Sequence, residues 1–389
     1  MHRRAPAQFA APAAPWSRRD WLRAASSALA LGAPPWLISS PAHALPQRAL
    51  QFPRDHGSHP ELRTEWWYIT GQVRAEQRLY GFQVTFFRSR VDGTQSMQSE
   101  FAARQLIFAH AAVTDVQGQR QFHDQRIARA GFGIADASTT DAAIRLRDWS
   151  LTRRDLPSTT AAFALSQFRT QVVASDFSLD LTMTGTQPPI LQGAQGLSRK
   201  GPLPEQASYY YSEPQLAVSG ALSIQGKRMA VSAEPAPSNR AWMDHEWSES
   251  LMHPEAVGWD WIGMNLENGG ALTVFRLRRA DGSAVWAGGS YREKPTDPPQ
   301  VFAADQVQFT PTRLWTSADS GAKYPVQWRI QTPAGTFTVR ALLDAQELDS
   351  RGSTGAIYWE GRSELQNTQG QTVGHGYLEM TGYATRLKL

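Results

Sequence analysis

Apolar and polar residues alternate with a period of two along most of the chain. In "SLDLTMTG", Leu179, Leu181 and Met183 fall on one face of an extended segment, and polar side chains fall on the other. "LYGFQVTFF", "FRTQVVAS", "LAVSGALSI", "ALTVFRLRR", "VQWRIQT" and "TFTVRALL" are also short and rich in β-branched or aromatic residues. This pattern predicts many short β-strands.

Turns that contain glycine, such as Gln225-Gly226 and Asp281-Gly282, separate the predicted strands. No long stretch outside the N-terminal segment has a convincing helical period. Many short strands at even spacing favour an all-β fold, an antiparallel sandwich or barrel. The Pro- and Gly-rich stretch Gln187–Gln206 is predicted to be a long loop, and loops of that length are usually functional or disordered.

The strand pattern is interrupted in "AEPAPSNR", residues 233–240, by two prolines and a Ser-Asn pair. We place a domain boundary there, which predicts an N-terminal domain over residues 45–237 and a C-terminal domain over residues 238–389. Each has a length that is normal for a β-barrel domain.

The first 44 residues are typical of a twin-arginine export signal. "SRRDWLR" holds the arginine pair, a weakly apolar run follows it, and Ala42-His43-Ala44 is a small-residue cleavage signature. The run contains Gly32 and two prolines and is too short for a transmembrane anchor. We therefore expect a periplasmic or secreted protein without a transmembrane span in the mature chain.

Removal of this segment changes the charge of the chain. Five of the 39 basic residues and one of the 35 acidic residues lie in 1–44, so that 34 of each remain. A neutral mature chain gives no reason to expect a nucleic-acid partner. The chain has no cysteine, which excludes disulfides, thiolate catalysis and thiolate metal sites.

Six motifs in a fixed order identify a family resemblance. They are "EWWYITGQV" (65–73), "FAHAAVTD" (108–115), "GLSRKGPLPEQASYYYSEPQLAVSGAL" (196–222), "AWMDHEWS", "GWDWIGMNLENG" and "HGYLEMTGY" (375–383). The chain resembles the AttH-like, lipocalin-like secreted proteins that are grouped with the carotenoid hydratases (hydroxyneurosporene synthase) and kievitone hydratase. The resemblance implies two consecutive lipocalin-like domains, no cofactor, and a ligand site lined by aromatic side chains.

The segment "RAWMDHEWSES" (240–250) carries the candidate catalytic residues. In a strand, Asp244 and Glu246 share one face, and His245 and Trp247 share the other. Hydration of an isolated C=C bond needs a proton donor, an aromatic face for the carbocation and a base for water. A carboxylate buried beside an indole can hold a proton near neutral pH. We assign the proton donor to Asp244 or Glu246, the orientation of water to His245 and the cation contact to Trp247.

The resemblance supports this assignment in part. In the related hydratases, a His-x-Trp pair and a downstream Tyr and Asp are associated with the chemistry, and His245 and Trp247 match the pair. The following strand here reads Phe275-Arg276-Leu277 and has no acid. Asp244, Glu246 or Asp260 would therefore have to provide the proton.

Further aromatic and polar residues are candidates for the ligand site. Tyr210 in "ASYYYSEP" is expected to direct its hydroxyl inward as a donor, on the face opposite to its two tyrosine neighbours. The candidate substrate-binding residues are Trp67, Tyr210, Trp242, Trp259, Asp260 and Trp261, and the secondary candidates are Glu65 and His110.

Three alternatives stay open. Asp244, His245 and Glu246 could form a hydrogen-bonded plug that closes a barrel end. In a helix, His245, Glu249 and His253 would line one face as metal ligands, although we expect no metal and no cofactor. The protein could also be a non-catalytic carrier of an isoprenoid or another lipid that serves an ABC-type transporter, as the AttH name suggests. A secreted hydrolase lacks support, because the chain has no Gly-x-Ser-x-Gly elbow and no His-Glu-x-x-His motif.

Overall fold

The computed structural model describes residues 44–156, 164–232 and 238–387. The predicted export signal over residues 1–44 lies, apart from its last residue, outside this part of the chain. In the described residues, the only helices are three 3₁₀ turns, and none of them is long and apolar enough to cross a membrane. They are η1 (Arg54–His56), η2 (Asp92–Thr94) and η3 (Ala304–Gln306).

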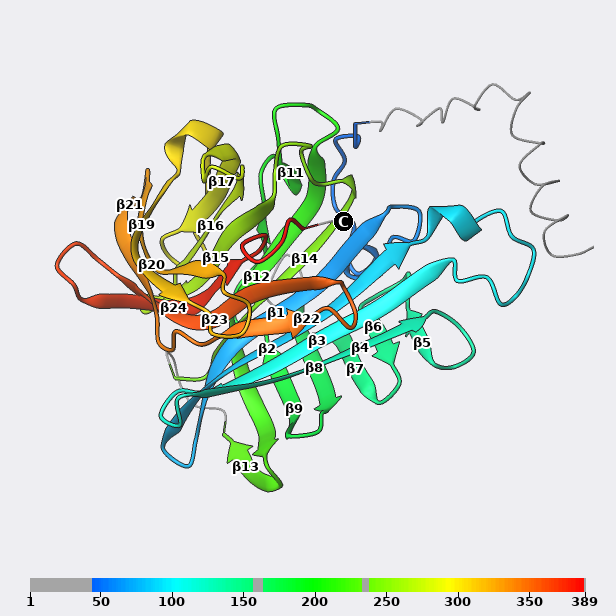
Figure 1. Ribbon diagram of the computed structural model, residues 1–389, viewed down its shortest axis with the longest axis horizontal. Coiled ribbons are helices and arrows are strands. Elements are labelled where there is room, and N and C mark those ends of the chain that lie inside the picture. Colours follow the sequence, from blue (N-terminus) through cyan, green and yellow to red (C-terminus); the bar gives the residue numbers. More distant parts are fainter. Residues whose placement is uncertain (1–43, 157–163, 233–237, 388–389) are drawn as a thin grey trace, which may run out of the picture. The chain divides into compact units, whose positions relative to one another are not determined.

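Within the described residues, the first sheet has 14 strands and is antiparallel throughout. Its main path runs in the order β4-β3-β2-β1-β14-β12-β9-β8-β7-β6-β5 (Figure 1). The strands are β1 (Thr64–Ala75), β2 (Arg78–Arg90), β3 (Gln105–Asp115), β4 (Arg120–Arg129), β5 (Ala135–Ala137), β6 (Ala143–Leu146), β7 (Trp149–Leu156), β8 (Leu165–Val173), β9 (Phe177–Thr184), β10 (Ile190–Leu191), β11 (Leu197–Arg199), β12 (Ala207–Ile224), β13 (Lys227–Val231) and β14 (Arg240–Ser250).

The second sheet has 10 strands in the described part of the chain, with the order β18-β17-β16-β15-β24-β23-β21-β20-β19 and with β22 paired to β23. The strands are β15 (Gly258–Leu266), β16 (Ala271–Arg278), β17 (Ala284–Arg292), β18 (Gln300–Phe302), β19 (Gln308–Thr316), β20 (Lys323–Thr332), β21 (Gly335–Ala341), β22 (Glu347–Ser350), β23 (Ala356–Gln366) and β24 (Thr372–Met380). The predicted all-β class with two consecutive lipocalin-like antiparallel domains is confirmed.

The alternation in the sequence explains the burial of these strands. In β9, every second residue from Phe177 to Met183 is buried, and the residues between them are half-buried. Between β12 and β13, Gln225 (φ 49°) and Gly226 (φ 82°) both adopt the left-handed conformation that a two-residue type I′ hairpin requires. The turn signal predicted at Gln225-Gly226 is therefore a hairpin turn.

Each sheet surrounds its own apolar core, and a third cluster joins the two sheets. Trp67, Phe82 and Trp149 belong to the first core, and Trp328 and Trp359 belong to the second. The third cluster brings residues of β1 and β14 together with residues of β15, β16 and β24. We call the region where this third cluster joins the two sheets the seam. A cavity in the seam is lined by strands of both sheets.

The segment that joins the two predicted domains has a specific topology. The strand β14 begins at Arg240, beyond the predicted boundary at residue 237, yet it lies between β1 and β12 in the first sheet. The first sheet therefore includes residues from both sides of that boundary.

Candidate functional site

A cavity of about 290 Å³ lies at the seam between the two sheets. The first sheet lines it with residues of β1, β2, β3, β4 and β14, and the second with residues of β15, β16, β23 and β24. Its aromatic lining consists of Trp66, Tyr68, Phe87, Phe108, Trp259, Trp261, Phe275 and Tyr358. The walls are therefore mainly apolar, as in sites for small organic ligands.

Five acidic residues belong to the lining, and the carboxylate of one of them, Glu65, is held by two histidines in the first sheet. The other four interrupt these apolar walls. Asp244 and Glu246 come from β14 in the first sheet, and Glu360 and Glu379 come from β23 and β24 in the second. Glu360 and Glu379 are directly opposite each other in the register of β23 and β24. Each sheet thus contributes two acids that are neighbours on one face.

Asp244 is held by two aromatic side chains. The Tyr210 hydroxyl donates a hydrogen bond to Oδ2 of Asp244 at 2.6 Å, and the Trp242 indole donates one to Oδ1 at 2.6 Å. The side chain is almost fully buried, and this burial raises the pKa of Asp244 to about 7. At neutral pH, this acid can hold or release a proton.

Glu246 belongs to an ion pair at the same wall. The ammonium of Lys200 lies 2.9 Å from its Oε1 atom, and Ser208 Oγ donates a hydrogen bond of 2.5 Å to the same oxygen. Lys200 also lies over the rings of Phe275 and Tyr210, at 4.1 and 4.6 Å from their centroids. The lysine charge is thus balanced by Glu246 and by two ring faces.

The two acids of the second sheet have raised proton affinities. Burial raises the pKa of Glu360 and of Glu379, and the charge of Glu379 adds to the effect on Glu360. The charges of Asp244 and Glu246 also raise the pKa of Glu379, so the acids of the two sheets influence each other across the cavity. Glu360 is fully buried, and Glu379 keeps part of its surface open to the cavity.

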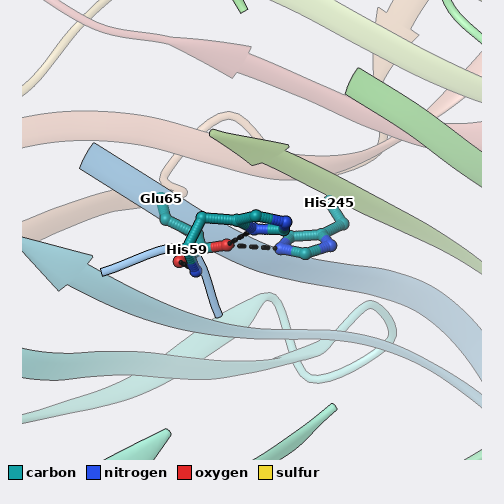
Figure 2. A group of neighbouring side chains, drawn as sticks. All are labelled: His59, Glu65 and His245. Carbon is teal, nitrogen blue, oxygen red and sulfur yellow. Dashed lines mark hydrogen bonds and ion pairs between the residues drawn. The ribbon is translucent and has the colours of Figure 1, made fainter. Parts of the chain in front are cut away.

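The predicted division of faces along β14 is confirmed. Asp244 and Glu246 line the seam cavity, whereas His245 and Trp247 point into the core of the first sheet. There, His245 Nε2 lies 3.0 Å and His59 Nδ1 lies 2.7 Å from Oε1 of Glu65. Figure 2 shows this carboxylate between the two imidazole rings. The backbone of β14 therefore separates the proposed proton donors from the proposed water-orienting histidine.

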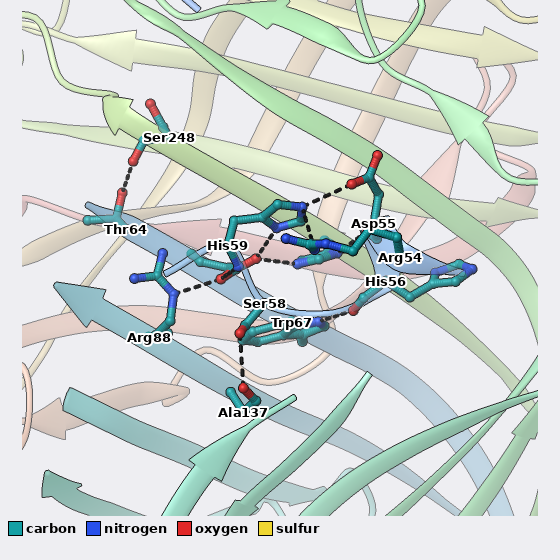
Figure 3. Close-up of polar contacts among 12 residues, drawn as sticks. Arg54, Asp55, His56, Ser58, His59, Thr64, Trp67, Arg88, Ala137 and Ser248 are labelled. Carbon is teal, nitrogen blue, oxygen red and sulfur yellow. Dashed lines mark hydrogen bonds and ion pairs between the residues drawn. The ribbon is translucent and has the colours of Figure 1, made fainter. Parts of the chain in front are cut away.

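The cluster around Glu65 is completed by the segment that precedes β1. Arg88 Nε donates to Oε2 of Glu65 at 2.7 Å, and His59 Nε2 lies 3.1 Å from Oδ1 of Asp55 (Figure 3). His59 stacks on Trp247, and His245 stacks on Trp67. Despite burial, these hydrogen bonds hold the pKa of Glu65 well below its usual range. His245 thus lies in a hydrogen-bonded plug, against which Trp247 packs. The plug among the alternatives is met only in part, because Asp244 and Glu246, which it included, line the cavity instead.

One set of described residues could hold a metal ion. It consists of His59, Glu65 and His245, whose ligand atoms lie within 4.8 Å of one another. In this arrangement, a carboxylate oxygen already lies between the two ring nitrogens, and Arg88 balances its charge. The helical alternative, with His245, Glu249 and His253 on one face, is wrong. Residues 240–250 form a strand, and Glu249 pairs with Arg90.

The other predicted residues separate into two groups. Trp259 and Trp261 line the cavity, and Trp259 stacks on Trp66 with ring centroids 6.4 Å apart. Asp260 points to the opposite side of β15, where it accepts hydrogen bonds from Arg276 and Tyr383.

His110 lies at the edge of the cavity and joins the two sheets. Its Nδ1 atom lies 2.9 Å from the Tyr358 hydroxyl, and its Nε2 atom lies 2.8 Å from Ser353 Oγ. Trp242 and Tyr210 face the seam and hold Asp244, whereas Trp67 and Glu65 belong to the plug.

Most of the cavity residues escaped the sequence-based prediction. Among them are Tyr68, Lys200, Tyr358, Glu360 and Glu379. The alternation in "YWEGRSEL" and "HGYLEM" places each glutamate on a definite face, but the pattern does not say which faces of separate sheets meet. Lys200 lies just after β11, inside the stretch Gln187–Gln206 that was expected to be a loop and that contains the short strands β10 and β11.

These features define a class of protein: two antiparallel β-sheets that share an aromatic, acid-lined cavity at their seam. The chain belongs to the AttH-like family, because the family model matches residues 43–383. No protein of curated function matches the chain in sequence.

Solved structures agree with the assignment of the chain to this family and with its fold. The crystal structure of an AttH protein from Nitrosomonas europaea is 43% identical and has a TM-score of 0.77, over 87% of this chain and 99% of that chain. Kievitone hydratase from Nectria haematococca has a TM-score of 0.64 at 14% identity, over 87% and 94% of the two chains. CghA with Sch210972 has a TM-score of 0.52 at 12% identity, over 82% and 88%. At these low identities, the last two comparisons concern the fold alone.

Proposed function

We propose that the protein binds a compact, unsaturated apolar molecule in the seam cavity and adds water across one of its C=C bonds. The observation that carries this proposal is the position of Asp244 in an aromatic cavity, with a pKa raised by burial to about 7. A carboxyl group that is still partly protonated at neutral pH can protonate an alkene carbon, which an ordinary carboxylate cannot do.

The remaining steps use groups in the same cavity. The ring faces of Trp259 and Trp261 would stabilise the carbocation that forms when Asp244 gives up its proton. Water then adds to the cationic carbon and loses a proton to a carboxylate, for which Glu379 on the opposite wall is available. The step consumes only water and returns one proton to the cavity. It needs neither His245 nor Trp247.

The size of the cavity limits the ligand. Ligand pockets commonly measure roughly 300–1,000 Å³, and this cavity, at about 290 Å³, lies at the small end. A short isoprenoid suits this volume better than a long polyene. The structural likeness to kievitone hydratase is compatible with a hydratase, although it concerns only the fold.

A second candidate is a non-catalytic lipid carrier that works with an ABC-type transporter. One observation favours it: both oxygens of Asp244 already accept hydrogen bonds, from Tyr210 and Trp242, as in a carboxylate with a structural task. In either case we retain the proposal that residues 1–44 direct export through the twin-arginine route to the periplasm or beyond.

The two candidates differ in a measurement with heavy-oxygen water. The purified mature protein is analysed by mass spectrometry for a co-purified lipid, which is then incubated with the protein in this water. We expect incorporation of the label, with a loss of more than about 100-fold in Asp244→Asn.

Glu213→Gln is the matched control. Glu213 is a buried acid whose pKa burial also raises to about 7, but it lies beside Ser166 in the first sheet, outside the cavity. Its substitution should leave label incorporation unchanged. Tight retention of an unlabelled lipid by all variants would support the carrier instead.

A further inference from the structure

A group of exposed apolar side chains lies on and beside two turns of the first sheet. The first turn, residues 91–104, joins β2 to β3 and projects beyond these strands (Figure 1), and the second, residues 130–134, joins β4 to β5. Among the described residues, ten large hydrophobic side chains are exposed, and five of them gather here. We call these five the apolar tip: Met97, Phe101, Ile127, Phe132 and Ile134.

Contacts between side chains hold the two turns together. The rings of Phe101 and Phe132 stack with their centroids 5.5 Å apart. The guanidinium of Arg129 lies over both rings, 4.1 Å from the centroid of Phe132 and 5.7 Å from that of Phe101. Phe101 is nevertheless 76% exposed and Phe132 is 55% exposed. Apolar rings that stay in water are costly, and a cluster of them on a surface is typical of a binding site for a partner or a membrane.

The backbone directs Phe132 outward in a conformation that bulky residues avoid. Its φ angle is 56°, between Gly131 at 103° and Gly133 at 68°. A residue with a large side chain rarely adopts a positive φ, because its Cβ atom then crowds the backbone. Since the ring is more than half exposed, packing within the protein does not explain a phenylalanine at this position.

The apolar tip is continuous with the lining of the seam cavity. Ile127 belongs to both, since it is 37% exposed and also lines the cavity. Ile127 and Arg129 share one face of β4, where they are opposite Phe108 and Leu106 of β3. Both of these β3 residues line the cavity. Apolar side chains therefore extend from the stacked rings to the cavity wall.

Arginines surround the apolar tip. Arg104, Arg129 and Arg145 each donate a hydrogen bond to a backbone carbonyl of the two turns. Two acids offset part of this charge, because Glu100 lies in the first turn and Asp136 is opposite Arg145 in the register of β5 and β6. An arginine can lay its stem along apolar groups while its guanidinium reaches a phosphate. The surface thus combines exposed rings with a small excess of positive charge.

We propose that the apolar tip docks on the surface of a lipid bilayer, where Met97, Phe101 and Phe132 enter the apolar layer and the arginines contact headgroup phosphates. A protein partner would need a hollow that matches the two projecting turns, whereas a fluid bilayer adapts to them. This docking goes beyond the proposed function. Only its consequence, a path by which an apolar ligand passes from the bilayer to the cavity, rests on that function.

The test is co-sedimentation of the mature protein with vesicles of phosphatidylcholine and phosphatidylglycerol. We expect the wild type to sediment with the vesicles. The double variant Phe101→Ser/Phe132→Asn should bind at least about tenfold more weakly, because it removes both rings from the contact. Asparagine is chosen at position 132 because it tolerates a positive φ. The melting temperature should not fall, since both rings are exposed in the folded protein.

Val301→Ser/Leu314→Ser is the matched control. These two side chains are also exposed, by 45% and 59%, but they belong to β18 and β19 of the second sheet. The control should bind the vesicles as tightly as the wild type does. A wild type that does not sediment with the vesicles, or an equal loss in both double variants, would overturn the inference. So would dimers of the wild type that the phenylalanine variant does not form, without vesicle binding, because the tip would then join two copies of the chain.

The outcomes separate this inference from the proposed function, because the incorporation of label from heavy-oxygen water is measured without vesicles. Vesicle binding that depends on the two phenylalanines, without incorporation of label, supports the docking surface and rejects the hydratase. Incorporation of label by a protein that does not bind vesicles supports the hydratase and rejects the docking surface.

Discussion

Asp244 and His245 are adjacent in sequence, yet their side chains lie in different environments. The strand β14 directs Asp244 to the seam cavity and His245 to the plug, where Glu65 and the Asp55 carbonyl face its two ring nitrogens. Because strand residues alternate between two faces, neighbours on β14 cannot act on the same small ligand. The resemblance to the hydratases assigned His245 to the chemistry. Its contacts in the structure are those of a residue that stabilises the fold.

A first prediction follows from this placement: His245→Ala should reduce stability and leave ligand binding intact. The substitution leaves Glu65 with Arg88 and His59 but removes a buried partner and the ring that stacks on Trp67. We expect the free energy of unfolding to fall by about 3 kcal/mol, because a hydrogen bond to a buried carboxylate and the packing of a buried ring are lost. Urea denaturation measures this loss, and binding of the co-purified lipid to the folded variant should be unchanged.

His253→Ala is the control for this prediction, because His253 lies in the loop after β14 and is only half-buried. It should change the free energy of unfolding by less than about 0.5 kcal/mol. A His245→Ala protein with wild-type stability and no activity would contradict the plug and restore His245 to the chemistry.

At the scale of the elements, the sequence allowed the strands and their faces to be predicted. In β9, a slip of one residue would expose the whole apolar set. In β14, residues on both faces are buried, and the period of two decides which of them face the cavity and which face the core. The opposite faces of Tyr210 and its neighbours are confirmed as well, because Tyr210 bonds to Asp244 while Tyr211 bonds to His56.

Contacts between strands that lie far apart in the sequence could not be predicted from it. Glu360 and Glu379 enter the site only because the second sheet packs against β14, and no local pattern encodes that contact. Asp55 and His59 precede the first strand, in a segment without periodicity, and their role depends on a barrel end that forms far along the chain. The sequence thus predicts the acids of the first wall and two tryptophans of the second, Trp259 and Trp261, and misses the acids of the second wall.

A second prediction concerns the contact between β3 and the segment from β22 to β23. Burial lowers the pKa of His110 to about 3, so the ring is neutral in the folded protein and bonds to Tyr358 and Ser353. A histidine with a lowered pKa stabilises the fold above its unfolded value of 6.5, and this stabilisation is lost as the pH falls towards 3. His110→Gln does not titrate. As the pH falls from 6.5 towards 3, the free energy of unfolding of His110→Gln should fall less steeply than that of the wild type. The difference in slope should be up to about 1.4 kcal/mol per pH unit.

Denaturation of both proteins by urea at a series of acidic pH values checks this. His123→Gln serves as the control, because His123 is more accessible than His110 and burial lowers its pKa as well. His123→Gln should change the dependence of the free energy of unfolding on pH less than His110→Gln does. Equal slopes for the wild type and His110→Gln would show that His110 is charged or mobile in the folded protein.

At the scale of the whole molecule, the two sheets depend on each other through the site they share. The cavity has walls from both, and β14, which follows the predicted boundary, lies inside the first sheet. A chain cut after residue 237 would lack the strand between β1 and β12 and would lose Met243, His245 and Trp247 from the first core or its plug.

A third prediction uses this topology. A fragment of residues 45–237 should fail to fold cooperatively, whereas a fragment of residues 45–252, which retains β14, should show the circular dichroism of a β-sheet and a urea transition. Because β14 is a central strand, its removal leaves two unpaired edges within the sheet. Cooperative unfolding of the shorter fragment would show that residues 45–237 form a complete domain, as the sequence pattern suggests.

The buried acids also give the molecule a stability that depends on pH. Burial raises the pKa of Glu213 from 4.5 to about 7, so the folded protein binds more protons than the unfolded chain between these values. The contribution of Glu213 to the free energy of unfolding must therefore fall as the pH rises through this window. Glu213→Gln keeps an acceptor for the Ser166 hydroxyl and does not titrate. Its stability relative to the wild type should rise by about 3 kcal/mol between pH 4.5 and pH 8.

Urea denaturation at several pH values across this window measures the difference. Glu61→Gln, at an exposed position, should give a curve parallel to that of the wild type. Asp244→Asn should diverge from the wild type in the same direction as Glu213→Gln, because burial raises the pKa of Asp244 to about 7 as well. If Glu213→Gln diverges and Asp244→Asn does not, Asp244 is ionised in the folded protein, and it could not be the group that gives a proton to the ligand.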